Sequence, residues 1–218
     1  MTTRTESVDT PAGEARITWY PAPARTARLV LALSHGAGGG IEARDLRALA
    51  AALPAQGVTV ALVEQPWRVA GKKVAAAPKV LDAGWRGLWP ALERPGLPVV
   101  AGGRSAGARV ACRTAAELGA AGVLALAFPL HPPGRPEKSR AEELTGAGRP
   151  TLVVQGGRDP FGRPQEFPPP GAQVAYELVE VPHADHAFAV PKKAGPTQEE
   201  TLTVITEAVA GWLAGLPR

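Results

Sequence analysis

The sequence predicts a single α/β domain over residues 1–218, with three layers formed by a mostly parallel sheet and helices on both of its faces. Two observations lead to this class. Short apolar runs alternate with segments of helical spacing, which is the pattern of successive βαβ units. No internal repeat, low-complexity tract or linker interrupts that alternation, and 218 residues suffice for one buried core.

The first half of the chain supplies strands and one clear helix. The alternating segment 15–20 predicts an edge strand, whereas the apolar run 28–34 is typical of a strand buried on both faces. Leucines near helical spacing predict a helix over 41–53, and a second apolar run predicts a buried strand over 58–64. Residues 74–94 are partly helical in pattern, with boundaries that proline and glycine leave open.

In the second half, each predicted strand ends where a polar or glycine-rich segment begins. Ligands of open α/β sheets bind at the carboxyl ends of the strands, so chemistry is expected at these exits. We expect Thr197 to cap the last helix, because its hydroxyl is suited to accept a backbone N–H there. The predicted elements are strands at 98–103, 122–129, 151–157 and 175–181 and helices at 105–118 and 197–213.

Composition excludes several classes of function. The net charge of +4 comes from scattered lysines and arginines without a basic stripe, so we expect no nucleic-acid partner. The single cysteine, Cys112, excludes an internal disulfide and leaves too little for a thiolate zinc site; its place in a predicted helix favours a buried apolar role. The N-terminus lacks an apolar signal core and the apolar stretches are too short to span a bilayer, so we expect a cytoplasmic protein without membrane contact.

One motif carries chemistry. The segment 103–107 reads GRSAG and matches G-x-S-x-G between a predicted strand and a predicted helix. Glycines let the chain turn sharply there, which lifts the hydroxyl of Ser105 out of the sheet, and the helix that follows offers free N–H groups. The alternative is an ordinary glycine-rich strand-to-helix turn.

A serine hydroxyl becomes nucleophilic when a base takes its proton. Asp159 follows the predicted strand 151–157, and His186 follows the predicted strand 175–181. Serine, acid and histidine then come in the order of hydrolytic triads on α/β sheets, each at a strand exit. We therefore expect Ser105 as nucleophile, Asp159 as acid and His186 as base.

Two alternatives stay open at these positions. His183 lies only three residues before His186, and we favour His186 because a longer loop is needed to fold back over the serine. Asp185 is the alternative acid, although adjacent residues rarely present their side chains in the required geometry. Neither choice is settled by spacing alone.

A reaction at a carbonyl also needs donors for the developing oxyanion. The N–H of Ala106, just after the serine, is one candidate. The second is expected from the glycine-rich loop after strand 28–34, where we favour Ala37 and keep Gly38 as the alternative; Gly38 is also a candidate substrate contact. His35 in the same loop is expected to be structural.

These residues give the chain a resemblance to the α/β-hydrolase superfamily over nearly its whole length. It resembles most the small subgroup of dienelactone-hydrolase-like proteins, testis-expressed protein 30 and the hydrolase-like domain of an NSL acetyltransferase complex subunit. The resemblance implies the α/β-hydrolase fold and the Ser105, Asp159 and His186 assignment. Typical dienelactone hydrolases use cysteine as the nucleophile, which this chain replaces by serine. The matching segments are SHGAGG (34–39), GGRSAGAR (102–109), PLHPPGRPE (129–137), QGGRDPFG (155–162) and DHAF (185–188).

The expected activity is hydrolysis of a small ester or thioester, with no cofactor and no metal. The insert 130–150, where this fold often carries a cap, has only 21 residues, so we expect a minimal cap and an open site. Arg104 is a candidate substrate contact for an anionic group; the alternative is a structural role, paired with a carboxylate such as Glu64. For three further cations near the site, Arg135, Lys138 and Arg140, we favour a solvated loop over a substrate contact. For Trp67, Trp85 and Trp89 we favour core packing over the lining of a pocket.

Two other functions share this sequence pattern. A catalytically idle hydrolase fold would serve as a protein-interaction component, since fold does not establish function. An acyltransferase would use the same triad and differ in water exclusion. Against the idle scaffold, all three triad positions keep chemically competent residues.

Overall fold

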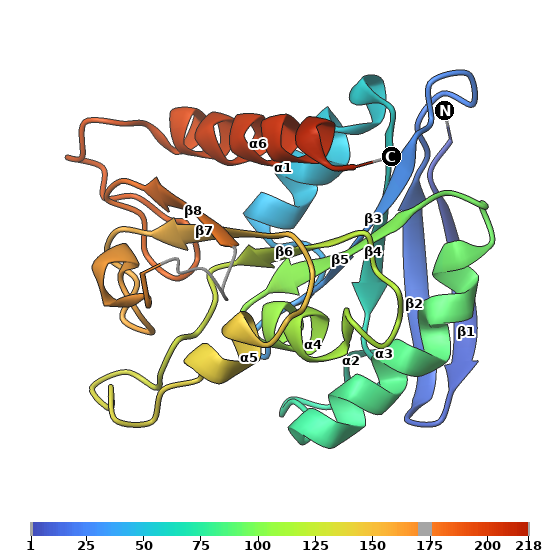
Figure 1. The fold of residues 1–218 in the computed structure, drawn as a ribbon, viewed down its shortest axis with the longest axis horizontal. Coiled ribbons are helices and arrows are strands. Elements are labelled where there is room, and N and C mark those ends of the chain that lie inside the picture. The colour runs from blue at the N-terminus through green and yellow to red at the C-terminus, as the bar shows by residue number, and fades with distance from the viewer. Residues whose placement is uncertain (1, 170–175, 218) are drawn as a thin grey trace.

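The computed structural model describes residues 2–169 and 176–217 and has the expected three layers (Figure 1). Its eight-stranded sheet has the order β1-β2-β4-β3-β5-β6-β7-β8. The β2 strand pairs antiparallel with β1 and β4, and the remaining neighbours pair in parallel. The strands are β1 (Arg4–Thr10), β2 (Gly13–Tyr20), β3 (Leu29–Ser34), β4 (Val58–Glu64), β5 (Val99–Arg104), β6 (Gly122–Leu126), β7 (Thr151–Gly156) and β8 (Tyr176–Val181).

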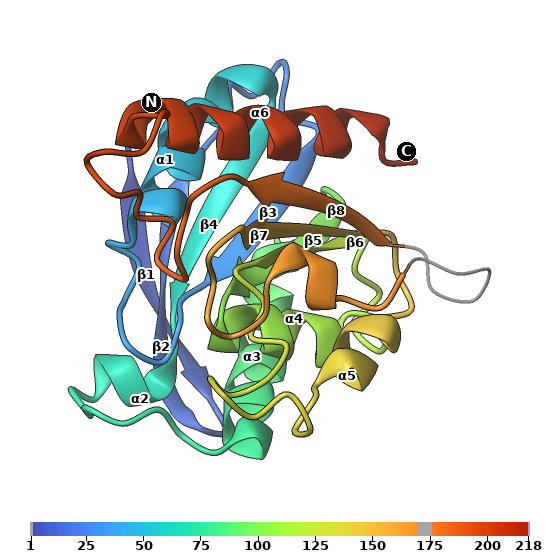
Figure 2. The same cartoon turned by 90° about the vertical axis from the view of Figure 1, so that its left-hand side faces the viewer.

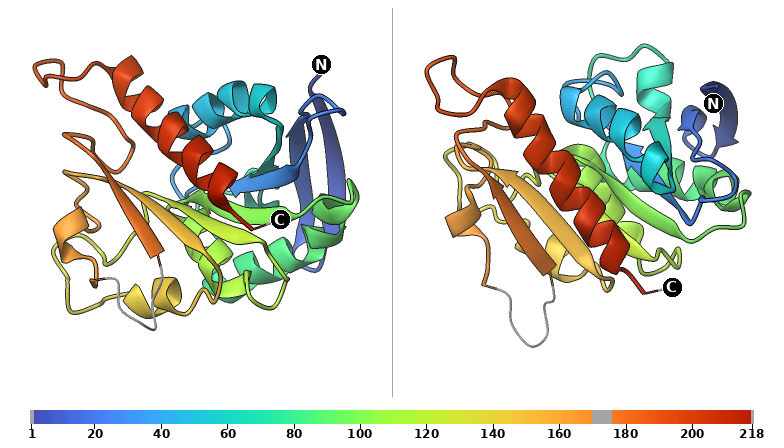
Figure 3. Two further views of the ribbon diagram at one scale, coloured as in Figure 1. Left: turned by 45° about the horizontal axis from the view of Figure 1, so that its top comes forward. Right: turned by 90° about the horizontal axis from the view of Figure 1, so that it is seen from above.

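Helices cover both faces of the sheet. One face carries α1 (Arg44–Ala52) and α6 (Gln198–Gly215), and Figure 3 shows α6 running across that layer. The opposite face carries the other helices (Figure 2). These are α2 (Pro66–Val69), α3 (Pro78–Glu93), α4 (Ala106–Thr114) and α5 (Ala141–Thr145).

The two faces have separate apolar cores because side chains alternate along a strand. In β3, Val30 and Ala32 pack in the core under α3 and α4, whereas Leu31 and Leu33 pack in the core under α1 and α6. All positions of β3 are buried, which explains its continuously apolar sequence.

The predicted strands and long helices are present, with shifts of a few residues at their ends. Thr197 caps α6, where its Oγ1 accepts the Glu200 N–H at 3.2 Å, as expected. Cys112 is buried, also as expected. The helical pattern of 74–94 corresponds to α3, which contains Pro90. Ala175, the first residue of the predicted strand 175–181, lies outside the described residues.

The strand predicted at 15–20 is present as β2, but its predicted edge position was wrong. The preceding polar segment forms β1, which pairs with β2 and takes the edge position. The search for apolar runs missed β1 because its side chains are polar. An edge strand can be polar, since it is held by backbone pairing and by contacts such as the hydrogen bond from Trp19 Nε1 to Glu6 (2.7 Å). The short helices α2 and α5 were also missed.

Candidate active site

The nucleophile candidate sits on a strained turn. Ser105 lies between β5 and α4 with φ 53° and ψ −112°, a region that residues with a Cβ rarely adopt. The flanking glycines make the turn possible: a Cβ on Gly103 or on Gly107 would lie 2.6 Å from the Ser34 carbonyl oxygen. The turn therefore packs directly against the exit of β3, and the Ser105 side chain is displayed at the carboxyl edge of the sheet.

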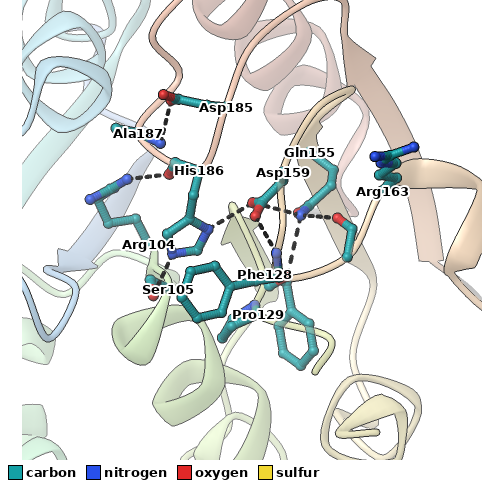
Figure 4. Close-up of polar contacts among 12 residues, drawn as sticks. Arg104, Ser105, Phe128, Pro129, Gln155, Asp159, Arg163, Asp185, His186 and Ala187 are labelled. Atoms are coloured by element: carbon teal, nitrogen blue, oxygen red, sulfur yellow. Dashed lines mark hydrogen bonds and ion pairs between the residues drawn. The ribbon is translucent and has the colours of Figure 1, made fainter. Parts of the chain in front are cut away.

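The three predicted triad residues lie in one chain of hydrogen bonds (Figure 4). Ser105 Oγ is 2.9 Å from His186 Nε2, and His186 Nδ1 is 2.7 Å from Asp159 Oδ2. The His186 side chain is 21% exposed and that of Asp159 is fully buried, so the histidine reaches the surface while the carboxylate does not. The Phe161 ring packs beside the imidazole, with ring centroids 4.2 Å apart.

The Asp159 carboxylate is fixed by two further donors. Gln155 Nε2 donates to Oδ2 at 2.9 Å, and the Phe161 N–H donates to Oδ1 at 2.8 Å. Gln155 is fully buried in β7 and also donates to the Gly162 carbonyl at 2.8 Å. This bond connects the loop that contains Asp159 to the strand. Sequence reasoning missed Gln155, whose only signal was one amide in the apolar run of β7.

The alternatives for the base and the acid are placed elsewhere. His183 is exposed, whereas His186 faces Ser105. The Asp185 carboxylate accepts the N–H groups of Ala187 and Ala189 at 2.8 and 2.9 Å and so shapes its own turn. Its Oδ1 is engaged by that turn, and the imidazole contacts Asp159.

The glycine-rich loop after β3 lies beside the serine. A Cβ on Gly36 would lie only 3.2 Å from the Ser105 Cβ, so the glycine-rich loop approaches the nucleophile closely. Within the described residues, neither the Ala37 N–H nor the Ala106 N–H donates a hydrogen bond to protein. A Cβ on Gly38 would meet nothing within 4 Å, so this part of the loop borders open space.

The chain resembles known proteins in both sequence and fold. A family model described as an alpha/beta hydrolase domain matches residues 25–214. The chain belongs to the α/β-hydrolase family. A comparison of the chain with curated proteins found no match.

Solved α/β-hydrolase structures share the fold over almost their full length. XC6422 from Xanthomonas campestris, described as an α/β serine hydrolase without a lid, is 20% identical with a TM-score of 0.71, covering 100% of this chain and 97% of that one. A dienelactone hydrolase from Anabaena variabilis is 20% identical with a TM-score of 0.74, covering 100% and 99%. Est1E from Butyrivibrio proteoclasticus is 14% identical with a TM-score of 0.70, covering 96% and 99%.

Arg104 pairs with a carboxylate, as the structural alternative expected, but its partner is Asp45 and not the suggested Glu64. Its Nε lies 3.2 Å from Oδ2 of Asp45 in α1, and one terminal nitrogen donates to the His186 carbonyl at 2.5 Å (Figure 4). Glu64 instead pairs with Arg16 at 3.6 Å. Strand β4, which carries Glu64, is separated from the Ser105 turn by β3, whereas Asp45 of α1 lies beside the guanidinium. Asp45 and the His186 carbonyl therefore occupy two sides of the Arg104 guanidinium.

Other side chains considered near the site have structural contacts. His35 is buried, its Nε2 accepts the Gln65 N–H at 3.2 Å, and burial lowers the pKa of its imidazole despite the Gly36 carbonyl beside it. The tryptophans at 67, 85 and 89 are buried in the core under α3. Arg140 donates to the Pro129 carbonyl at 3.1 Å, while Arg135 and Lys138 are exposed.

Two kinds of feature are absent from the part of the chain that the structure describes. Among residues 2–169 and 176–217, no cluster of three or more histidine, cysteine or acidic side chains has the arrangement of a metal site. In the same described ranges, none of the helices is both long and apolar enough to cross a bilayer.

Proposed function

We propose that the chain is a serine hydrolase that cleaves a carboxylic ester or thioester of a small substrate through an acyl-enzyme on Ser105. One observation carries the proposal: an unbroken hydrogen-bond chain joins the strained Ser105 hydroxyl to His186 and to the buried Asp159. A purely structural turn with the same sequence pattern would not require these two hydrogen bonds. Such a hydrogen-bond chain is the arrangement by which a weak hydroxyl becomes a nucleophile.

In this mechanism Ser105 Oγ attacks the substrate carbonyl carbon as His186 Nε2 takes its proton. Asp159 holds the imidazole in the required tautomer and stabilises the imidazolium. The tetrahedral intermediate collapses, and the imidazolium gives its proton to the departing alcohol or thiol. Water, deprotonated by the same imidazole, then releases the acyl group and restores the serine.

The negative oxygen of the intermediate would be held by the N–H groups of Ala37 and Ala106, with Gly38 as the alternative donor. Both proposed donors lack protein acceptors among the described residues. The N-terminal end of α4 adds a partial positive charge at the same place. One such donor contributes about 3 kcal/mol in the transition state.

The test is labelling by a fluorophosphonate probe, which reacts with activated serines. Native protein is expected to be labelled, and folded Ser105→Ala and His186→Ala variants are expected to be silent. His183→Ala is the matched control, because that histidine is exposed and outside the hydrogen-bond chain. Absence of labelling in well-folded native protein would contradict the proposal. It would favour a catalytically inactive protein-interaction component, whose partner would then be sought by pull-down.

A panel of p-nitrophenyl esters and small thioesters then defines the acyl group accepted. An acyl chain of short length is expected to react fastest, since the insert between β6 and β7 contains only the short helix α5 and carries no large lid.

A further inference from the structure

The residue before the nucleophile links the segments that form the site. Arg104 belongs to the strand end that carries Ser105, and its guanidinium reaches Asp45 of α1 and the carbonyl of His186. The third guanidinium nitrogen, Nη1, lies 3.7 Å from where a Cβ on Gly36 would be, so the guanidinium is also next to the glycine-rich loop after β3. The guanidinium thus contacts α1 and the loop that carries His186, and it lies beside the glycine-rich loop after β3.

From these contacts we infer that Arg104 is a positioning residue, which with Asp45 sets the distance between the His186 ring and the Ser105 hydroxyl. The inference rests on the proposed function and deepens it. The Asp159 contact restrains the imidazole at Nδ1, and the Arg104 contact restrains the backbone of the same residue from the opposite side. With both ends held, Nε2 stays within 2.9 Å of Oγ.

The ion pair with Asp45 explains how the guanidinium is held. Asp45 is fully buried and Arg104 is 13% exposed, so a lone carboxylate or a lone guanidinium would be costly there. Burial raises the pKa of the Asp45 carboxyl, and the neighbouring Arg104 opposes that rise. Neither charge has a second ionic partner among the described residues, so the ion pair keeps the guanidinium beside Asp45. The 3.2 Å contact lacks hydrogen-bond geometry, and both Asp45 oxygens are left without a hydrogen bond to protein.

Lysine does not replace arginine in this role. A guanidinium is a planar fork with five N–H donors, whereas an ammonium is a compact charge on a flexible stem. A lysine ammonium at this position would keep only one of the two contacts. It would stay beside Asp45 and release the His186 carbonyl, or bind that carbonyl and leave Asp45 unpaired. A displacement of about 1 Å at reacting atoms costs about 10²-fold in rate.

The test uses Arg104→Lys, with Arg113→Lys as the matched control. Arg113 also pairs with a carboxylate in the fold, Asp82 at 2.6 Å, but contacts neither His186 nor its loop. We expect Arg104→Lys to reduce both the fluorophosphonate labelling rate and kcat on p-nitrophenyl acetate by about 10²-fold, with KM unchanged. The control is expected to lose thermal stability and to keep its labelling rate. Native rates in Arg104→Lys would overturn the inference.

A second variant and a second readout guard against misfolding and against failure of the proposed function. Asp45→Asn removes the counter-charge that holds the guanidinium and keeps a side chain of similar size, so a fall in kcat at constant KM is again expected. If native protein is not labelled at all, the proposed function fails, and hydrogen exchange of segment 183–188 still tests the inference. Exchange there should accelerate in Arg104→Lys and stay native in Arg113→Lys; equal exchange in both would overturn it.

Discussion

The Nδ1 atom of His186 lies 2.7 Å from Oδ2 of Asp159, a carboxylate with no exposed surface. The other carboxylate oxygen is occupied by the Phe161 N–H at 2.8 Å. In the buried acid, Oδ2 therefore serves the imidazole and Gln155, and Oδ1 serves its own loop. This division fixes which ring nitrogen faces Ser105.

Asp159→Asn is expected to keep the fold and to lower kcat by about 10⁴-fold, because the amide favours the wrong imidazole tautomer. Thermal unfolding checks the fold, and hydrolysis of p-nitrophenyl acetate checks the rate. Asp185→Asn is the matched control, since Asp185 caps its own turn and does not contact the ring. Equal losses in the two variants would contradict the assigned acid.

Ser105→Gly is expected to be more stable than Ser105→Ala, by about 1 kcal/mol or more, because glycine adopts a φ of 53° without the strain of a Cβ. Urea unfolding of the two inactive variants measures the difference directly. A more stable alanine variant would mean that the turn stores no strain.

Gly103→Ala is expected to destabilise the fold by about 3 kcal/mol. The added Cβ would lie 2.6 Å from the Ser34 carbonyl oxygen and 2.8 Å from the Gly107 carbonyl carbon, both of them backbone atoms that have little freedom to move. Gly39→Ala is the control for stability, since a Cβ there meets nothing within 4 Å. Similar urea midpoints for the two variants would rule out the close packing described for the Ser105 turn.

Stability is expected to fall on acidification partly through Glu143. Burial opposes ionisation of this residue, but Arg109 at 2.7 Å and Arg113 at 2.9 Å outweigh it and lower the pKa of the carboxyl. A depressed folded-state pKa stabilises the fold above the unfolded value of about 4.3, and this contribution is lost as pH falls through the folded value. The Tm difference between native protein and Glu143→Gln should therefore shrink below about pH 4. A constant difference between pH 7 and 3 would count against this role.

Cys112 is expected to resist alkylation in the native state. Burial raises the pKa of its thiol to about 12, and the thiolate is the reactive form. Iodoacetamide at neutral pH should modify it only after denaturation in guanidinium, as followed by mass spectrometry. Rapid modification of folded protein would show that the helix α4 opens locally.

The strands and long helices were predictable because their signals are local. Continuous apolar runs mark strands buried on both faces, and the glycines around Ser105 mark a sharp strand-to-helix turn. The edge strand β1 escaped because backbone pairing holds it and its side chains remain polar.

The sequence by itself determined the order of Ser105, Asp159 and His186 and the strand exits that carry them, because chain connectivity in a parallel sheet brings such exits to one edge. Only the tertiary structure decided that His186 rather than His183 faces the serine, that Gln155 holds the acid, and that Arg104 pairs with Asp45. Each of these contacts depends on rotamers and loop paths that bring distant residues within hydrogen-bond reach. Spacing along a chain fixes which elements neighbour each other, and packing fixes which atoms meet.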